Sequence, residues 1–334
     1  MYPLRLLRVV FPLLVAACAR GPASSRTSVL RDDLLVPSAQ SGPHQVLLNG
    51  VRHHYRVAGP STGSAPPVVF LHGGPGQGSV HFDALVGPLM ERQLRMVYFD
   101  QRGSGLSERP ASGDYALATL VEDVEALRRT LATEKIALIG HSFGGLLALE
   151  YSAKYSERVS HVVFVAGLWD APLLCRLRAQ RFAELRPEAY ARVRADTLNR
   201  DGSRRSDCEL EARGLQGADR DRYNTELMFP EPRSEQQMDS VNLAHGVRNT
   251  GEMSRSLFSA GLLRHRFSAF HRLTMPVLVI AGGKDGAARP AGLRELATRL
   301  PRARYLEFER SGHFVYLDEP ERFAREVASF ILAR

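Results

Sequence analysis

Short apolar runs recur along the chain, and segments with a helical spacing of apolar residues separate them. Each run has five residues, is almost wholly apolar and leads into a polar or glycine-containing loop. Continuous apolar runs of this length are typical of strands that are buried on both faces of a parallel sheet. The runs lie at Val68–His72, Met96–Asp100, Ile136–Gly140, Val162–Ala166 and Val277–Ala281.

Helical patterns fill the intervals between these runs. From Leu117 to Leu131, apolar residues recur three and four positions apart, which places them on one face of a helix. The last segment opens with Asp318 and Pro320, which favour a helix N-terminus, and then carries an apolar face. Ahead of the first run, the Asn-Gly pair at 49–50 is a strong turn signal between two short strands. The alternation predicts an α/β fold with a mostly parallel, doubly wound sheet.

One long segment breaks this alternation. Residues 169–270 contain no strand-like run, but they carry several helical patterns and many charges. Because the segment lies between two predicted core strands, we interpret it as a helical lid inserted into the sheet domain. The core then consists of residues 43–168 and 271–334.

The N-terminus has the pattern of an export signal. Residues 1–17 carry two arginines followed by an apolar stretch that is too short to span a membrane as a helix. The stretch ends in Val-Ala-Ala-Cys, which resembles a bacterial lipobox and makes Cys18 the expected lipidation site. The residue directly after Cys18 is Ala19 rather than an acidic residue, a pattern that resembles outer-membrane lipoproteins facing the periplasm. The alternative is an ordinary signal peptide. Residues 18–42, rich in small residues and proline, predict a flexible tether.

The overall composition excludes several classes of protein. Charged residues make up 24% and hydrophobic residues 44% of the 334 positions, as in ordinary globular domains. That balance excludes a disordered chain, a coiled coil and a polytopic membrane protein. The formal net charge of +8 comes from arginines spread along the chain, so we predict no nucleic-acid-binding surface.

Two cysteines, Cys175 and Cys208, lie within the predicted lid. The sequence has no Cys-x-x-Cys pair and no Cys/His cluster, so it indicates neither a zinc site nor a redox site. In an oxidising compartment these cysteines either pair as a disulfide or remain two separate thiols.

A candidate nucleophile, Ser142, stands in the sequence Gly-His-Ser-Phe-Gly between a predicted strand and a predicted helix. Gly-x-Ser-x-Gly is weak evidence alone, but at a strand-to-helix turn it holds the serine exposed and strained. The backbone N–H of Phe143 would donate to a developing oxyanion. The second oxyanion donor is expected from the loop His-Gly-Gly-Pro-Gly, at Gly74 or alternatively Gly73. His141 is interpreted as structural.

A serine hydroxyl needs a base and an orienting acid. In this strand–turn–helix arrangement the acid and then the histidine follow the serine along the chain. His313 comes after the last core strand that could supply the acid, so we expect it to be the base. Asp285, just after the run at 277–281, is the favoured acid, and Asp170 is the alternative one strand earlier.

Three motifs together resemble the proline iminopeptidase branch of the α/β-hydrolase superfamily. They are the oxyanion loop at 72–76, the segment Asp-Gln-Arg-Gly-Ser-Gly-Leu-Ser at 100–107, and the serine motif. The resemblance implies an α/β-hydrolase fold and an aminopeptidase that releases N-terminal proline from small peptides. We interpret the segment at 100–107 as a rigid structural turn.

Within this family, acidic lid residues hold the free amino group of the substrate. In this chain the candidates for that role are Glu226 and Glu231, together with Glu235 and Glu252. The alternatives are a carboxylesterase or lactonase acting on a small ester and, more remotely, a binding protein without activity. The serine mechanism requires no metal or organic cofactor. The expected partners are therefore a small peptide or ester, and a membrane only through the lipid anchor.

Overall fold

The computed structural model describes residues 39–61, 65–198, 202, 204–247 and 250–333. The predicted signal peptide, Cys18 and nearly all of the predicted tether lie outside the described residues. The tether prediction ends at residue 42, yet the first strand already begins at Gly42.

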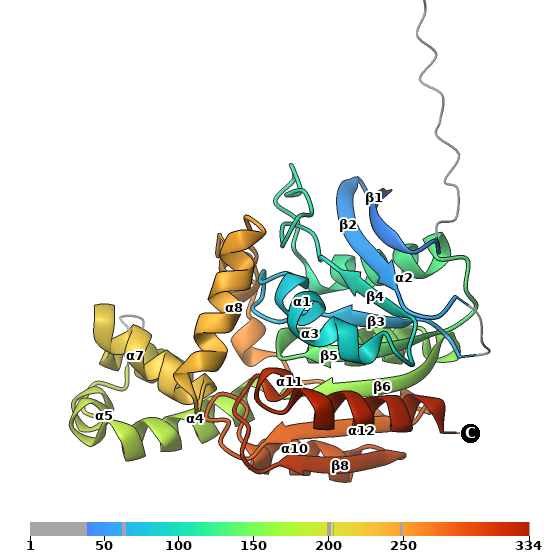
Figure 1. Ribbon diagram of the computed structural model, residues 1–334. Coiled ribbons are helices and arrows are strands. Elements are labelled where there is room, and N and C mark those ends of the chain that lie inside the picture. The colour runs from blue at the N-terminus through green and yellow to red at the C-terminus, as the bar shows by residue number, and fades with distance from the viewer. Residues whose placement is uncertain (1–38, 62–64, 199–201, 203, 248–249, 334) are drawn as a thin grey trace, which may run out of the picture. The chain divides into compact units, whose positions relative to one another are not determined.

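An eight-stranded sheet forms the centre of the fold (Figure 1). Strand β2 runs antiparallel to both β1 and β4, and the strands from β3 to β8 are parallel. The predicted α/β class with a mostly parallel sheet is therefore confirmed. In spatial order the strands are β1 (Gly42–Leu48), β2 (Val51–Ala58), β4 (Met96–Phe99), β3 (Val68–Leu71), β5 (Ile136–His141), β6 (Val159–Val165), β7 (Val277–Gly282) and β8 (Ala303–Phe308).

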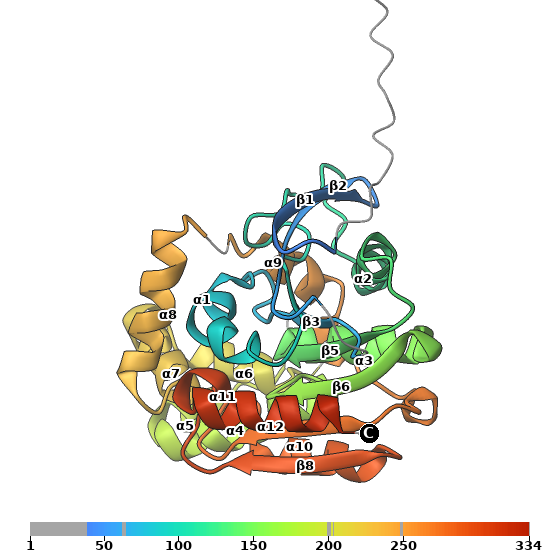
Figure 2. The same cartoon turned by 45° about the vertical axis from the view of Figure 1, so that its right-hand side comes forward.

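Helices cover both faces of the sheet, which explains why its inner strands are apolar throughout. One face packs against α1 (Val80–Met90), α11 (Val315–Asp318) and α12 (Pro320–Leu332), and Figure 2 shows α12 in the foreground. The other face packs against α2 (Leu117–Thr130), α3 (Phe143–Lys154) and α10 (Pro290–Arg299).

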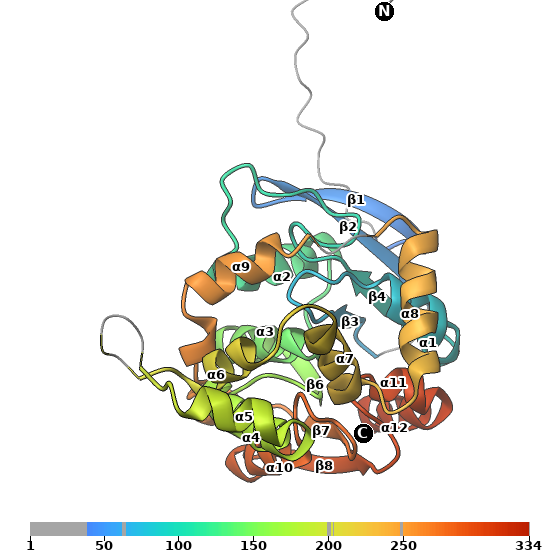
Figure 3. The same cartoon turned by 90° about the vertical axis from the view of Figure 1, so that its left-hand side faces the viewer.

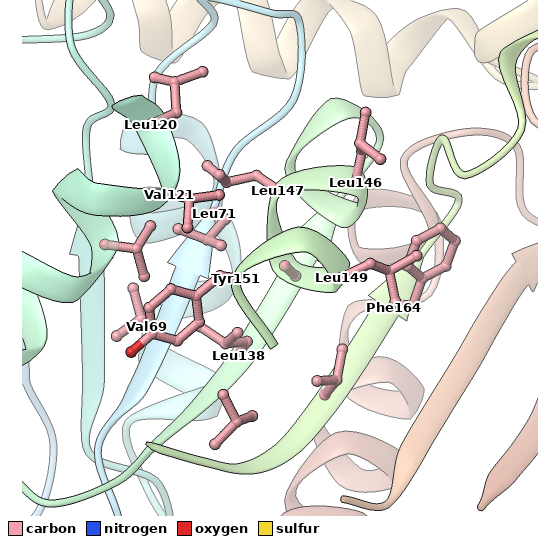
Figure 4. Close-up of a cluster of buried hydrophobic side chains, with 14 of the residues drawn as sticks. Val69, Leu71, Leu120, Val121, Leu138, Leu146, Leu147, Leu149, Tyr151 and Phe164 are labelled. Atoms are coloured by element: carbon pink, nitrogen blue, oxygen red, sulfur yellow. The ribbon is translucent and has the colours of Figure 1, made fainter. Parts of the chain in front are cut away.

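The core beneath α2 and α3 is shown in Figure 4. Val69, Leu71 and Leu138 of the sheet meet apolar side chains of the two helices, including Leu120 and Leu147. All five are buried. Burying such a side chain fully stabilises the fold by roughly 1.5–3 kcal/mol. The core therefore fixes the end of β5, from which the serine motif projects.

The lid, residues 169–270, follows β6, and α-helices make up most of its described part (Figure 3). These are α4 (Ala171–Leu185), α5 (Pro187–Arg194), α6 (Asp207–Gly214), α7 (Gly217–Met228), α8 (Pro232–Ala244) and α9 (Glu252–Ser259). The helices have a small core of their own, which includes Phe182, Leu215, Tyr223 and Leu227.

A disulfide and a buried tryptophan fix the root of the lid. Cys175 of α4 pairs with Cys208 of α6, which resolves the alternatives that the sequence left open. Trp169, the one tryptophan in the chain, is 1% exposed. Its Nε1–H donates to the carbonyl of Gly292 in α10 at 3.0 Å, so the lid begins against the sheet domain.

Candidate active site

Ser142 stands in the tight turn between β5 and α3 with φ 54° and ψ −119°, a strained conformation for a residue with a side chain. Glycines on either side make the turn possible. A Cβ on Gly140 would collide with the carbonyl oxygen of Gly144, and one on Gly144 would collide with that of Leu71. The sequence motif thus has its predicted strand-to-helix context.

His313 and Asp285 meet beside this turn. Asp285 follows β7 and His313 follows β8, and the His313 Nδ1 to Asp285 Oδ2 distance is 2.8 Å. The other carboxylate oxygen accepts the backbone N–H groups of Ala287 at 2.7 Å and Ala288 at 2.9 Å. Because the Asp285 carboxylate accepts at Nδ1, the imidazole carries its proton there, which leaves Nε2 as an acceptor.

Asp170 does not take this position. It precedes α4, where its carboxylate accepts the N–H of Leu173 at 2.8 Å and caps the helix. It also lies 3.7 Å from a guanidinium nitrogen of Arg266. The structure therefore brings the favoured acid, Asp285, to His313 and gives Asp170 a local structural role.

His141, next to Ser142, anchors the backbone of His313. Its Nε2 lies 3.0 Å from the His313 carbonyl oxygen, so this nitrogen carries the proton and donates. Burial and the neighbouring His313 lower the pKa of His141 well below its usual value, so the ring is neutral. Its Nδ1 then accepts the hydroxyl of Tyr316 at 3.4 Å.

The predicted oxyanion loop lies directly against the serine. A Cβ on Gly73 would come within 2.8 Å of the Ser142 Cβ, so only glycine allows this approach. His72 fixes the loop, since its Nδ1 donates to the Gly73 carbonyl at 3.0 Å and its Nε2 accepts the N–H of Gln101 at 3.1 Å. Gly74 and Phe143, the first residue of α3, both border the serine.

The segment at 100–107 supports the oxyanion loop from behind. Asp100 accepts hydrogen bonds from the N–H of Ser79 at 2.7 Å and of Leu106 at 2.9 Å. Burial alone would raise the pKa of Asp100, but these bonds and the nearby His54 and His72 lower it below its usual range. Neither Asp100 nor its segment borders the cavities at Ser142, in keeping with a structural turn.

Two cavities meet at the serine, and both are lined by Gly74, Ser142, Met228 and His313. The disulfide-side cavity, about 210 Å³, is walled mainly by apolar side chains and by the Cys175–Cys208 bridge. The α8-side cavity, about 510 Å³, is more polar. Its polar lining residues include Gln77, Asp239 and Asn242.

Comparison with known proteins shows the family to which the chain belongs. A model of the alpha/beta hydrolase fold matches residues 66–320. The chain belongs to the α/β-hydrolase fold family. A proline iminopeptidase of Pestalotiopsis fici is 25% identical over 298 residues, which span 86% of this chain and 98% of that protein.

Solved structures agree on the fold of this hydrolase. A proline iminopeptidase-related protein of Thermus thermophilus superposes with a TM-score of 0.70 and 26% identity, over 88% of this chain and 98% of that one. The enol-lactonase of Burkholderia xenovorans superposes with a TM-score of 0.61 over 87% of this chain and 100% of that one. At 23% identity, the second likeness shows the fold alone.

The four acidic lid residues that the sequence suggested do not border the serine. Glu226 lies 2.8 Å from Arg186 and lines a separate cavity on the far side of Asp285. Glu231 precedes α8 and lines another separate groove. Neither Glu235, which accepts the Thr225 hydroxyl, nor Glu252 lines a cavity at Ser142.

Sequence reasoning missed the polar groups that the lid does bring to the serine. Asp239 and Asn242 of α8 line the α8-side cavity, and Asn242 Oδ1 is buried without a hydrogen-bond partner among the described residues. Arg178 lines the disulfide-side cavity, where its Nε lies 3.2 Å from the Glu211 carboxylate. These residues stand in no motif, so only the packing of the lid helices reveals them.

Metal-binding clusters and membrane-spanning helices are both absent from the described part of the hydrolase. Within that part, no group of three or more His, Cys, Asp or Glu side chains could hold a metal ion. No helix among the same residues is both long enough and apolar enough to cross a membrane.

Proposed function

We propose that the protein is a serine hydrolase that works through an acyl-enzyme and releases proline or a similar residue from the N-terminus of small peptides. One observation carries the proposal: His313, which lines the same cavity as Ser142, has its Nδ1 2.8 Å from Asp285 Oδ2. The names of its relatives support the choice of substrate.

In this mechanism the Ser142 hydroxyl attacks the scissile carbonyl carbon while His313 Nε2 takes its proton. His313 then returns the proton to the leaving amine, and Asp285 stabilises the imidazolium that forms in between. The backbone N–H groups of Phe143 and Gly74 stabilise the negative oxygen of the tetrahedral intermediate. Water, activated by the same histidine, hydrolyses the acyl-enzyme and regenerates the serine.

Recognition of the free amino group is assigned to the α8-side cavity. An ammonium in a partly buried pocket needs an acidic partner and hydrogen-bond acceptors. Asp239 supplies a carboxylate there, and the polar residue Asn242 lines the same cavity. Glu226 and Glu231, which line other cavities, have no such place.

The test compares prolyl-4-nitroanilide with its N-acetylated form and with 4-nitrophenyl butyrate. Asp239→Asn should lower kcat/KM for the free-amine substrate about 10- to 100-fold, as the loss of a charged hydrogen bond of about 1.5–3 kcal/mol predicts. It should leave the butyrate rate within about twofold, because the ester carries no ammonium. Glu231→Gln is the matched control and should change neither rate.

A carboxylesterase or lactonase is the second candidate, favoured by the mainly apolar walls of the disulfide-side cavity. Equal turnover of the free and acetylated prolyl amides, or turnover of the ester only, would replace the aminopeptidase by this candidate. Failure of the wild-type protein to react with a fluorophosphonate would instead favour a binding protein without activity.

We also propose that the chain is exported and lipid-anchored through Cys18. The disulfide supports an oxidising compartment, since such bonds are rare in the reducing cytosol. Incorporation of labelled palmitate in bacteria, absent from a Cys18→Ser variant, tests the anchor.

A further inference from the structure

The C-terminal turn of lid helix α7 lies on the two loops that carry the acid and the base. The last carbonyl groups of an α-helix have no partner within the helix. Here the Leu227 carbonyl accepts the N–H of Gly286 at 2.8 Å, and the Met228 carbonyl accepts the N–H of His313 at 2.8 Å. Gly286 directly follows Asp285, so consecutive carbonyls of one helix hold both loops.

Two glycines make this contact as close as it is. A Cβ on Gly286 would lie 2.6 Å from Leu227 Cδ2, and one on Gly312 would overlap the Met228 carbonyl oxygen. Neither glycine has a φ in the left-handed region, where the backbone alone would call for glycine. The backbone of α7 is therefore what requires glycine at position 312. At position 286 a Cβ would displace the end of the Leu227 side chain and lie 3.2 Å from the Leu227 carbonyl oxygen.

The position of α7 depends in turn on the rest of the lid. Tyr223 and Leu227 pack into the lid core with Phe182 of α4 and Leu215. The Cys175–Cys208 bridge ties α4 to α6, and only two residues separate α6 from α7. A displacement of the lid core would therefore reach the carbonyls that hold the catalytic loops.

His313 is held on its other side by the sheet domain, through the hydrogen bond from His141 to its carbonyl. Its backbone thus has one anchor in the lid and one beside Ser142. Loss of the lid anchor leaves the backbone of His313 with only its hydrogen bond from His141. Small errors in position matter, because a displacement of about 1 Å can cost on the order of 100-fold in rate.

We propose that the C-terminal turn of α7, residues 227–228, positions the Asp285–His313 pair, so that the lid contributes to the chemical step even for small substrates. The proposal rests on the proposed serine hydrolase function. It differs from a lid that only shapes the substrate pocket, because such a lid would affect large substrates alone.

The test uses 4-nitrophenyl acetate, whose acyl group is a single acetyl, with Gly286→Ala and Gly312→Ala. Each variant should lower kcat about 10-fold or more with KM within about twofold, and should slow fluorophosphonate inactivation by a similar factor. Gly113→Ala is the matched control, because it adds the same methyl group at a φ of 68°, which costs stability, but at a place where nothing lies within 4 Å. It should retain the wild-type kcat.

A second arm leaves the catalytic loops unchanged. The double variant Cys175→Ser/Cys208→Ser should also lower kcat on the acetate ester, and its effect should be less than additive with Gly312→Ala. Unchanged acetate kcat in both the glycine and the serine variants, or losses confined to bulky substrates, would overturn the proposal. A wild-type protein that neither hydrolyses esters nor binds fluorophosphonate would overturn the proposed function instead.

Discussion

His313 uses three of its four polar groups to hold its own position. The backbone N–H is bound by Met228, the carbonyl by His141, and Nδ1 by Asp285. Nε2 is the remaining polar atom, on a side chain that lines the cavities of Ser142. Each of these hydrogen bonds restricts the orientation of the imidazole ring. A general base needs such a fixed orientation, because it must lie within hydrogen-bond distance of the proton that it takes.

Removal of the nucleophile or the base should therefore abolish turnover without unfolding the protein. Ser142→Ala and His313→Ala should each lower kcat by a factor on the order of 10⁵–10⁶, because the members of a triad act as a unit. Steady-state kinetics and fluorophosphonate labelling measure both losses. Full activity in the Ser142→Ala protein would remove the assignment.

The two candidate acids should separate clearly in the same assay. Asp285→Asn should lower kcat about 10⁴-fold, because an amide in place of the carboxylate favours the wrong tautomer of His313. Asp170→Asn should stay within about threefold, since an asparagine can still cap α4. A larger loss of kcat in the Asp170 variant would show that Asp170, after the earlier strand, is the catalytic acid.

At this scale, the sequence predicts the residues that stand in motifs. Ser142 was indicated by glycine spacing at a strand-to-helix turn, and His313 and Asp285 by their order after core strands. Met228 and Asp239 could not be predicted, because they reach the site through the packing of lid helices. The proposed roles of Glu226 and Glu231 came from the resemblance alone, and their side chains line other cavities.

At the scale of elements, the apolar runs in the sequence predict the strands of the sheet well. Strands that are buried on both faces need apolar residues at nearly every position, so they stand out in the sequence. The lid helices are harder to delimit from sequence. Helix α7, for example, buries only Tyr223 and Leu227, so its apolar face is too sparse to mark its ends. The lid helices are therefore held together by the small lid core and the disulfide, neither of which the helical pattern in the sequence reveals.

The disulfide should stabilise the lid measurably. Closing a loop across a sequence separation of 33 contributes about 4 kcal/mol on the chain-entropy model. Cys175→Ser/Cys208→Ser should therefore lower the unfolding temperature of the oxidised protein. Mass spectrometry without reduction, on protein made in an oxidising compartment, checks the bond itself, and two alkylated thiols would contradict it.

For the whole molecule, buried histidines should make stability depend on pH. Burial, together with the neighbouring His72, lowers the pKa of His81 from 6.5 to about 3. The unfolded chain therefore binds a proton between these values that the folded chain does not. Stability from this group is fully present above pH 6.5 and is lost as the pH falls toward 3, by up to about 1.4 kcal/mol per pH unit.

His81→Phe should reduce this dependence, because it keeps an aromatic ring at the position and removes the titratable group. At pH 7 the variant should be less stable by about 1 kcal/mol, because the 3.0 Å hydrogen bond to the Tyr316 hydroxyl is lost. As the pH falls from about 6.5 to about 4.5, its stability should decline less steeply than that of the wild type. Urea unfolding at several pH values measures both slopes, and identical slopes would refute the assignment.

Trp169 gives the hydrolase an internal optical probe. Its indole lies at the root of the lid, buried, with the Arg299 guanidinium 5.4 Å from the ring and the Phe270 ring 6.0 Å away. Because the chain has a single tryptophan, its ultraviolet emission comes mainly from this one position. Loosening of the lid root would expose the indole to water and shift that emission to longer wavelength. Stopped-flow fluorescence could therefore measure the rate of lid movement separately from the rate at which a chromophore is released.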